Sequence, residues 1–264
     1  MPESRRYRIG QIVPSSNTTM ETEVPAILRA REQLYPERFT FHSSRMRMHS
    51  VTAEELARMN LEGARCAAEL ADARVDVMST ACLVALMAMG PGYHRHAEAE
   101  LAERVRAGGS EAAVMTSAGA LLEGLSILRA RKIALLAPYT KQLTRLVVKY
   151  IEDAGVEVLD AINFDIADNL EVGRRDPMRL LDDVMKLKTA NADAVVLSVC
   201  VQMPSLPAVQ MAQDRLELPV TSTAICTARG MLDRLGLQGP VRGFGSLMSA
   251  EPSASAHAMQ DNQP

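Results

Sequence analysis

Short apolar segments rich in β-branched residues alternate with longer helical stretches along most of the chain. Strands that are buried on both faces have such continuous apolar runs, and regular alternation with helices is typical of parallel sheets. The segments expected to be strands are 8–13, 39–43, 75–79, 113–115, 132–137, 156–161, 194–198 and 219–222. The pattern therefore predicts an α/β fold with right-handed crossover connections.

Helical patterns fill the intervals between these strands. The clearest stretches are 117–128, 141–153, 176–188 and 223–235. The final twenty or so residues have no periodicity and several Ser and Ala residues, so we expect a loose tail there.

The order of segments repeats in the second half of the chain. The first strand of each half ends at a proline, Pro14 and Pro138, which are 124 residues apart. The third strands also correspond, and each is followed by a cysteine, Cys82 in one half and Cys200 in the other. Ligands bind outside the carboxyl ends of strands in open α/β sheets. The repeat therefore predicts two pseudo-symmetric domains that bring both thiols to one cleft.

Each of the two thiols lies in a turn that follows a strand. Cys82 stands between a strand and a helix, where the backbone amides of Leu83 and Val84 are free donors at a helix N-terminus, and this position lowers the pKa of a thiol. Cys200 occupies the equivalent turn, although prolines leave the start of the next helix open. Cys66 and Cys226 lie in helical apolar patterns and are expected to be core residues.

Three neutral side chains near strand ends are candidate ligand contacts: Asn17, Tyr139 and Asn169. Each also has an ordinary structural interpretation, since Asn17 could cap a helix, Tyr139 could be a buried anchor and Asn169 could cap a turn. Neutral donors around two thiols suit an anionic substrate held by amides and helix N-termini.

Composition narrows the class of protein. The 264 residues are 47% apolar and 23% charged, with a formal net charge of −3, which indicates a folded chain without a preference for nucleic acid or anionic membranes. No apolar run approaches the roughly 20 residues of a membrane span, and no signal peptide is evident, so we expect a cytoplasmic protein. The cysteine spacings fit neither a redox pair nor a zinc site, and nucleotide-binding glycine motifs are missing, which disfavours metal and nucleotide cofactors.

The motifs together resemble the aspartate/glutamate racemase superfamily, and within it the maleate cis-trans isomerases. The matching segments run to about residue 237 and are 14–17, 44–49, 81–84, 138–139, 167–173 and 200–207. The resemblance implies two Rossmann-like domains, each a four-stranded, mainly parallel sheet flanked by helices, with the active site in the cleft between them. It also implies that the helix after each fourth strand crosses over, which gives domains of 1–117 plus 224–264 and of 118–223.

The resemblance further implies a cofactor-independent reaction on maleate, a small dicarboxylate. Cys82 would add to one alkene carbon, Cys200 would handle the proton, and the succinyl-type adduct would rotate and eliminate to fumarate. Side chains of Asn17, Tyr139 and Asn169 would bind the carboxylates. Backbone amides after each cysteine, those of Leu83, Val84, Val201 and Gln202, would complete the site. A homo-oligomer, dimeric or tetrameric, and a place in nicotinate degradation are implied as well.

Two alternatives stay open at this point. A racemase or decarboxylase of the same superfamily would use the same scaffold, although a decarboxylase needs only one thiol. A two-lobed binding protein for small acids would need neither thiol to react.

Overall fold

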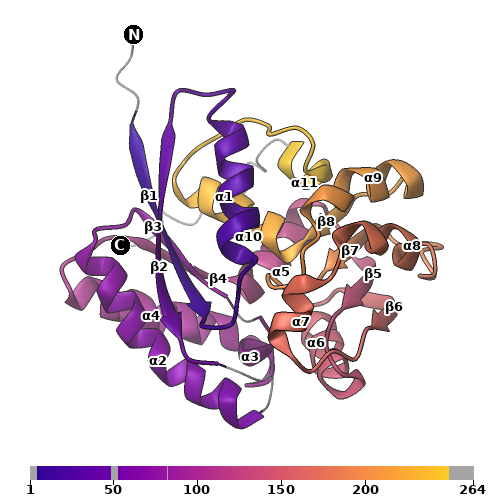
Figure 1. Cartoon of the computed structure of the whole chain (residues 1–264), viewed down its shortest axis with the longest axis horizontal. Coiled ribbons are helices and arrows are strands. Elements are labelled where there is room, and N and C mark those ends of the chain that lie inside the picture. The colour runs from indigo at the N-terminus through magenta and orange to yellow at the C-terminus, as the bar shows by residue number, and fades with distance from the viewer. Residues whose placement is uncertain (1–4, 49–52, 82, 250–264) are drawn as a thin grey trace, which may run out of the picture.

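Each half of the chain forms one β-sheet of parallel strands, and the two sheets stand side by side (Figure 1). The computed structural model describes residues 5–48, 53–81 and 83–249. The first sheet has the order β2-β1-β3-β4 and the second has the order β6-β5-β7-β8, so the same topology occurs twice. The strands are β1 (Arg6–Pro14), β2 (Arg38–Met46), β3 (Val77–Thr80), β4 (Ala113–Thr116), β5 (Lys132–Ala137), β6 (Glu157–Asn163), β7 (Ala194–Ser198) and β8 (Val220–Ser222).

All the pairings in both sheets are parallel, so the carboxyl ends of the strands of each sheet lie along one edge. The central strands β1, β3, β5 and β7 are almost wholly buried, as expected of strands with continuous apolar sequences. The helices that follow these strands are α1 (Met20–Arg31), α2 (Ala53–Asp72), α3 (Leu83–Met87), α4 (Tyr93–Ala107), α5 (Ser117–Ile127), α6 (Lys141–Asp153), α7 (Asn169–Arg174), a 3₁₀ turn η1 (Pro177–Arg179), α8 (Leu180–Val184), α9 (Leu206–Leu216), α10 (Thr223–Arg234) and α11 (Gly245–Ser249).

Equivalent residues build the same local features in each half. Asp76 accepts a hydrogen bond from the Arg8 amide, and Asp193 accepts hydrogen bonds from the amides of Arg131 and Lys132. Each carboxylate therefore holds the amino end of the first strand of its half, β1 or β5. These bonds to the Arg131 and Lys132 amides lower the pKa of Asp193. The repeat in the sequence is therefore also a repeat in hydrogen bonding.

The fourth strand of each sheet passes into a helix without a loop. Thr116 at the end of β4 accepts a hydrogen bond from the Gly119 amide, and Ser222 at the end of β8 accepts from the Ile225 amide. Both hydroxyls act as N-caps, which supply acceptors to amides that have no intrahelical partner. The two helices that start here, α5 and α10, pack against each other.

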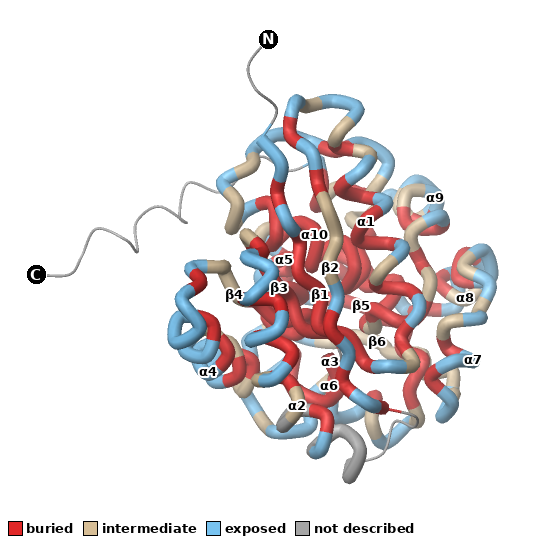
Figure 2. Tube along the Cα trace, turned by 60° about the vertical axis from the view of Figure 1, so that its left-hand side comes forward, coloured by how far each residue is buried: buried red, intermediate tan, exposed pale blue. Residues whose placement is uncertain are grey.

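Helices cover both faces of the first sheet. Helices α2 and α4 pack together on one face, whereas α1 and α10 pack together on the other, with α10 against β3 and β4. Most of α10 is buried, and the burial colouring in Figure 2 shows buried segments running through the strands and adjacent helices. Helix α10 therefore follows the last strand of the second sheet in the sequence, but it packs against the first sheet.

The structure confirms all eight predicted strands, with ends shifted by a few residues. The predicted helix over 176–188 is wrong in extent: Asp176 and Pro177 begin a 3₁₀ turn, and α8 ends at Val184. The expected tail begins instead with the short helix α11, whose Leu247 and Met248 are buried. Residues 250–264 lie outside the described part of the chain. The domain boundaries stay a prediction; α10 contacts the first sheet, and α11 contacts β8 and α9 of the second.

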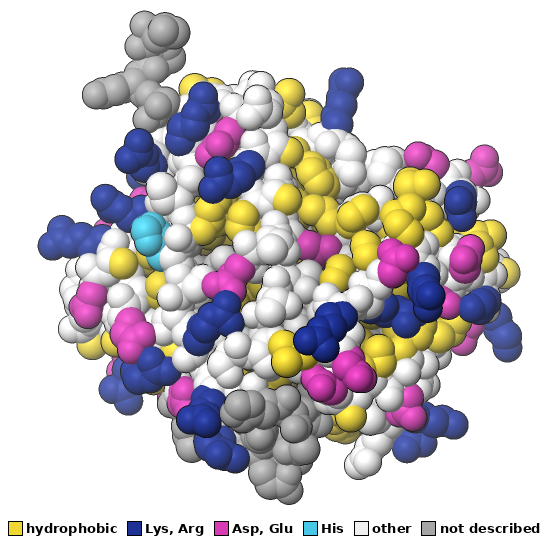
Figure 3. All heavy atoms as spheres, viewed as in Figure 1, with side chains coloured by type: hydrophobic (Ala, Val, Ile, Leu, Met, Phe, Trp, Pro, Cys, Tyr) yellow, Lys and Arg dark blue, Asp and Glu magenta, His cyan; other side chains and the backbone are white. Residues whose placement is uncertain are grey.

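The surface in Figure 3 has basic and acidic side chains interspersed over the face shown. Among the described residues, none of the helices combines the length and apolar character needed to cross a membrane.

Candidate active site

The loop from β1 to α1 holds Asn17 at the carboxyl end of the first sheet. Asn17 is 2% exposed, and its side-chain oxygen accepts hydrogen bonds of 3.0 Å from the amides of Thr19 and Met20. The asparagine therefore does hold the first turn of α1, as its structural interpretation predicted. Its NH₂ group, which can only donate, is the part of the side chain suited to a carboxylate.

Arg45, at the end of β2, fixes the shape of this loop. Its guanidinium donates to the carbonyls of Ser15 at 3.0 Å and Asn17 at 3.1 Å, and forms an ion pair with Glu21. Parallel pairing of β1 with β2 places Arg45 beside Val13, close to where the loop begins. The arginine acts on the backbone of the loop rather than standing free at the strand end.

Cys200 and Tyr139 meet at the corresponding ends of β7 and β5. Cys200 is partly buried, and its sulfur accepts a hydrogen bond from the Gln202 amide at 3.4 Å. Burial raises the pKa of the Cys200 thiol, while hydrogen bonds from the Tyr139 hydroxyl and from the amides of Gln202 and Met203 act in the opposite direction. The net effect favours the neutral thiol, and the same donors are available to stabilise a thiolate if the proton leaves.

Asn169 reaches the first sheet from the start of α7. It is 5% exposed, and its side-chain nitrogen donates to the Ser16 hydroxyl at 2.9 Å, while its carbonyl accepts from the Gln202 side chain at 2.8 Å. Asp168 caps α7 by accepting from the Leu170 amide, so the turn has its own cap beside Asn169. Asn169 thus belongs to a contact between the two halves, next to Asn17.

The other predicted thiol, Cys82, lies outside the described residues. Its neighbours in sequence are described: Ala81 follows β3, and Leu83 begins α3, with Leu83 and Val84 both buried. The first amides of a helix lack intrahelical acceptors, so those of Leu83 and Val84 remain candidate donors. Val201 is 2% exposed in the Cys200 turn. The roles of all these residues stay predictions.

Cys66 and Cys226 are core residues, as predicted. They are 0% and 1% exposed, respectively, and burial raises the pKa of each thiol, that of Cys226 to about 12. Neither shows the lowered pKa that marks a reactive thiol.

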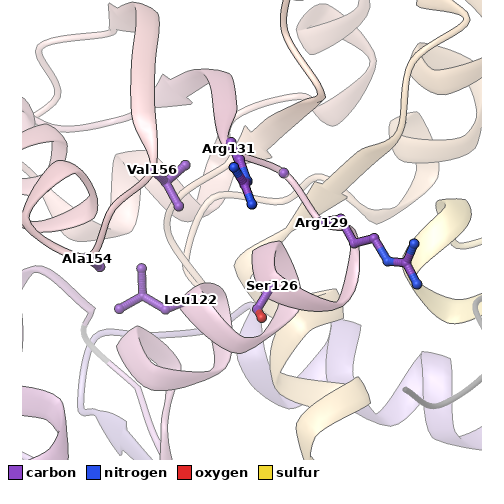
Figure 4. A pocket seen from close by; sticks show the side chains of 7 residues that line it. Leu122, Ser126, Arg129, Arg131, Ala154 and Val156 are labelled. Atoms are coloured by element: carbon purple, nitrogen blue, oxygen red, sulfur yellow. The ribbon is translucent and has the colours of Figure 1, made fainter. Parts of the chain in front are cut away.

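Two pockets lie at opposite ends of the strands, one at the amino ends of the second sheet and one beside the carboxyl end of β3. Figure 4 shows one of about 380 Å³, whose lining includes Arg131 and Val156 at the amino ends of β5 and β6, opposite to the end that holds Cys200. A second, of about 660 Å³, lies between α2, α3 and α4 and reaches Thr80 and Ala81. Neither contains Asn17, Tyr139, Asn169 or Cys200. Within the described residues, no group of three His, Cys, Asp or Glu side chains is arranged to hold a metal ion.

Comparison with known proteins identifies the family. A model of the arylmalonate decarboxylase family matches residues 9–248. A maleate isomerase of Geobacillus stearothermophilus is 57% identical over 94% of this chain and 99% of its own length. The chain belongs to the maleate isomerase family.

Structures of maleate isomerases have the same fold as this chain. A cysteine-to-alanine variant of the Pseudomonas putida enzyme with maleate has a TM-score of 0.92 and 51% identity, over 93% of this chain and 98% of that one. A Nocardia farcinica maleate cis-trans isomerase with a covalently bound succinylcysteine intermediate has a TM-score of 0.89 and 44% identity, over 92% and 98% of the two chains. Arylmalonate decarboxylase, at 19% identity and a TM-score of 0.73, shares the fold.

The side chains that connect the two halves of this chain were not predicted from the sequence. The Gln202 side chain bonds to the loop around Asn17, and Glu23 of α1 accepts from the amides of Ser205 and Leu206 at the start of α9. A buried Glu within an apolar helix pattern was the available signal for the second contact, because a buried carboxylate requires partners.

Proposed function

We propose that this chain catalyses the cis-trans isomerisation of maleate to fumarate through a covalent thiol adduct. The proposal rests on the 57% identity to a maleate isomerase over nearly the whole of both chains, which includes the Cys82 and Cys200 turns. The succinylcysteine recorded for the Nocardia relative supports a covalent route in this family. Rotation about a carbon-carbon double bond needs that bond to become single for a time, and addition of a nucleophile achieves this.

In the proposed first step, the Cys82 thiolate adds to one alkene carbon of maleate. A sulfur-carbon bond forms, and the π electron pair moves to the neighbouring carbon and its carboxylate as an enediolate. The position of Cys82 in the sequence, immediately before α3, supports this role, because the first amides of a helix lack intrahelical acceptors and favour negative charge.

Cys200 serves as the acid in the next step. Its thiol gives a proton to the carbanion carbon, which completes a succinyl adduct with a single bond between the two carbons. After rotation, the Cys200 thiolate removes a proton from the same carbon, the double bond reforms and Cys82 leaves. The raised pKa of Cys200, caused mainly by burial, keeps it protonated at neutral pH, and the backbone amides of Gln202 and Met203 stabilise its transient thiolate.

Donors from both halves bind the two carboxylates in this proposal. The NH₂ groups of Asn17 and Asn169 and the Tyr139 hydroxyl approach from three different loops, and amides of the two cysteine turns complete the set. Fixed donors around a developing enediolate stabilise it without reorganisation, which is the main source of rate enhancement in such sites.

A racemase or decarboxylase on this scaffold is the second candidate, because the arylmalonate decarboxylase model matches most of the chain. The presence of cysteines in both turns disfavours a decarboxylase, which needs one thiol. A binding protein without catalysis would leave both thiols unused.

The deciding experiment follows maleate and fumarate by proton NMR with purified protein and no added cofactor. Conversion of maleate to fumarate supports the proposal, and a Cys82→Ser variant under the same conditions serves as the control. Decarboxylation of an arylmalonate or racemisation of aspartate without any fumarate formation would contradict the proposal. A homo-oligomeric state, a cytoplasmic location and a place in nicotinate degradation are further parts of the proposal, and light scattering tests the first.

A further inference from the structure

The side chain of Gln202 uses its full hydrogen-bonding capacity at the junction of the two halves. It is 1% exposed, and its oxygen accepts from the amides of Thr18 at 2.8 Å and Thr19 at 3.3 Å. Its nitrogen donates to the carbonyls of Ser16 at 3.1 Å and Asn169 at 2.8 Å. A carboxamide has two donor hydrogens and two acceptor sites, so every position of this group is occupied by backbone.

These four bonds connect three parts of the proposed site. Ser16 and Thr18 flank Asn17 on both sides, Asn169 is itself a predicted ligand contact, and Gln202 lies two residues after Cys200. The backbone amide of Gln202 also donates to the Cys200 sulfur. One residue therefore fixes where both asparagines stand relative to the thiol.

We propose that Gln202 is a positioning residue, whose side chain sets the separation between the Cys200 thiol and the carboxylate-binding amides of Asn17 and Asn169. It acts through these residues and does not itself touch the substrate with its side chain. This inference rests on the proposed function, because the groups that it positions are those of the proposed reaction.

The later end of the Cys200 turn is hydrogen-bonded to helix α1, which follows the loop that contains Asn17. Glu23 of α1 accepts hydrogen bonds from the amides of Ser205 at 2.6 Å and Leu206 at 2.7 Å, and from the Ser205 hydroxyl at 3.3 Å. Glu23 and Ser205 are both buried. With Gln202 at one end and Glu23 at the other, the Cys200 turn is held against α1 and the loop before it, so a change at Gln202 shifts the thiol relative to Asn17.

Gly173 supplies independent support, because it leaves room for the Gln202 amide. A Cβ atom at residue 173 would stand 2.5 Å from Gln202 Nε2 and 2.9 Å from Thr18 Oγ1, and such distances require a shift. Gly173→Ala therefore displaces the carboxamide without removing any polar group from the site. The variant tests position separately from chemistry.

The main experiment measures kcat and KM for maleate in Gln202→Ala and Gln202→Glu. We expect Gln202→Ala to lower kcat at least tenfold with a smaller change in KM, because misplaced catalytic groups still allow binding. Gln213→Ala is the matched control: Gln213 also fastens backbone, accepting from Val220 and Ser246, but joins α9 to β8 and α11. The control should retain kcat, so a loss confined to Gln202 is not a general effect of losing a glutamine that is hydrogen-bonded to backbone.

Gln202→Glu provides a readout that a structural role would not give. Its ionised carboxylate accepts from Thr18 and Thr19 but faces the carbonyls of Ser16 and Asn169, whereas the protonated acid again donates to one of them. The ratio of its kcat to that of the wild type should therefore rise severalfold between pH 8 and pH 5.5. Gly173→Ala should lower kcat like Gln202→Ala, and it replaces that variant if Gln202→Ala does not fold.

Two results would overturn the inference: a folded Gln202→Ala whose kcat stays within threefold of the wild type, or a kcat ratio of Gln202→Glu to the wild type that stays constant across this pH range.

Alkylation of Cys200 by iodoacetamide, followed by peptide mass spectrometry, separates this inference from the proposed function. If the wild type does not isomerise maleate, the proposed function fails. The measured quantity is the Cys200 alkylation rate of each variant divided by that of the wild type at the same pH, because the thiolate fraction of every thiol changes with pH. A severalfold change in this ratio for Gln202→Glu between these pH values, absent for Gln213→Ala, would still support positioning, and a constant ratio would refute it.

Discussion

Raising the pH should destabilise this protein through Cys226, a buried thiol outside the proposed site. Cys226 is 1% exposed in α10, and burial raises its pKa from 9.0 to about 12. Because the folded pKa is the higher one, the unfolded chain loses its proton first, and stability is complete below pH 9 and falls between pH 9 and 12. Each unit in this window costs about 1.4 kcal/mol, so pH 10.5 should remove about 2 kcal/mol.

The assay compares urea unfolding of the wild type and Cys226→Ala at pH 8 and pH 10.5. The variant loses a well-packed sulfur and should be about 1 kcal/mol less stable at pH 8, but it has no thiol to ionise at this position. The order of stability should therefore reverse at pH 10.5, while effects of other titrating groups cancel in the difference. A stability difference that stays constant from pH 8 to pH 10.5 would refute the reasoning. Turnover of folded Cys226→Ala at pH 8 should equal that of the wild type.

Four further predictions concern the proposed chemistry. Cys82→Ala should abolish isomerisation because it removes the nucleophile, and mass spectrometry of the wild type with maleate should find the adduct on Cys82; near-normal turnover of the variant would contradict this assignment. Asn17→Ala and Asn169→Ala should each lower kcat by roughly a hundredfold or more, or about 2.7 to 4 kcal/mol, if their amides act in the transition state; a raised KM alone would show uniform binding instead. Cys200→Ala should bind maleate in calorimetry without turnover, and Cys200→Ser should do little better since a hydroxyl is a weaker acid. Because burial raises the pKa of Cys200, any decline of wild-type kcat from its ionisation should lie above pH 9, and a decline near neutral pH would argue against a Cys200 acid.

Much of the fold could be predicted because it depends on local sequence. Strands buried on both faces have continuous apolar runs that hardly vary with context, and the helix over 141–153 matches α6 with its Thr140 cap. The extent of the helix over 176–188 was predicted wrongly, because Pro177 begins a separate 3₁₀ turn. The Asp176 side chain caps this turn by accepting a hydrogen bond from the Met178 amide. The helix α11 depends on tertiary contacts, because Leu247 is buried against a glycine, Gly124, of a distant helix.

Part of the candidate site could also be predicted from the sequence, and part could not. The positions of Asn17, Tyr139 and Cys200 at strand ends follow from topology, which the repeat in the sequence indicates. The contacts of Gln202 and Glu23 depend on how the two sheets are oriented, and no local pattern determines that orientation. Sequence reasoning assigned Gln202 only a backbone amide, while the structure gives its side chain four bonds to backbone.

The packing of α10 on the first sheet has a consequence for synthesis of the chain. Strands β1 to β4 are complete by Thr116, but the helix that contacts β3 and β4 from one face ends at Arg234. At roughly 5 to 20 residues per second, a ribosome needs on the order of ten seconds to make the intervening segment. During that interval the apolar surface that α10 later covers stays open to water, so the N-terminal half waits for the C-terminal half before its own core can close.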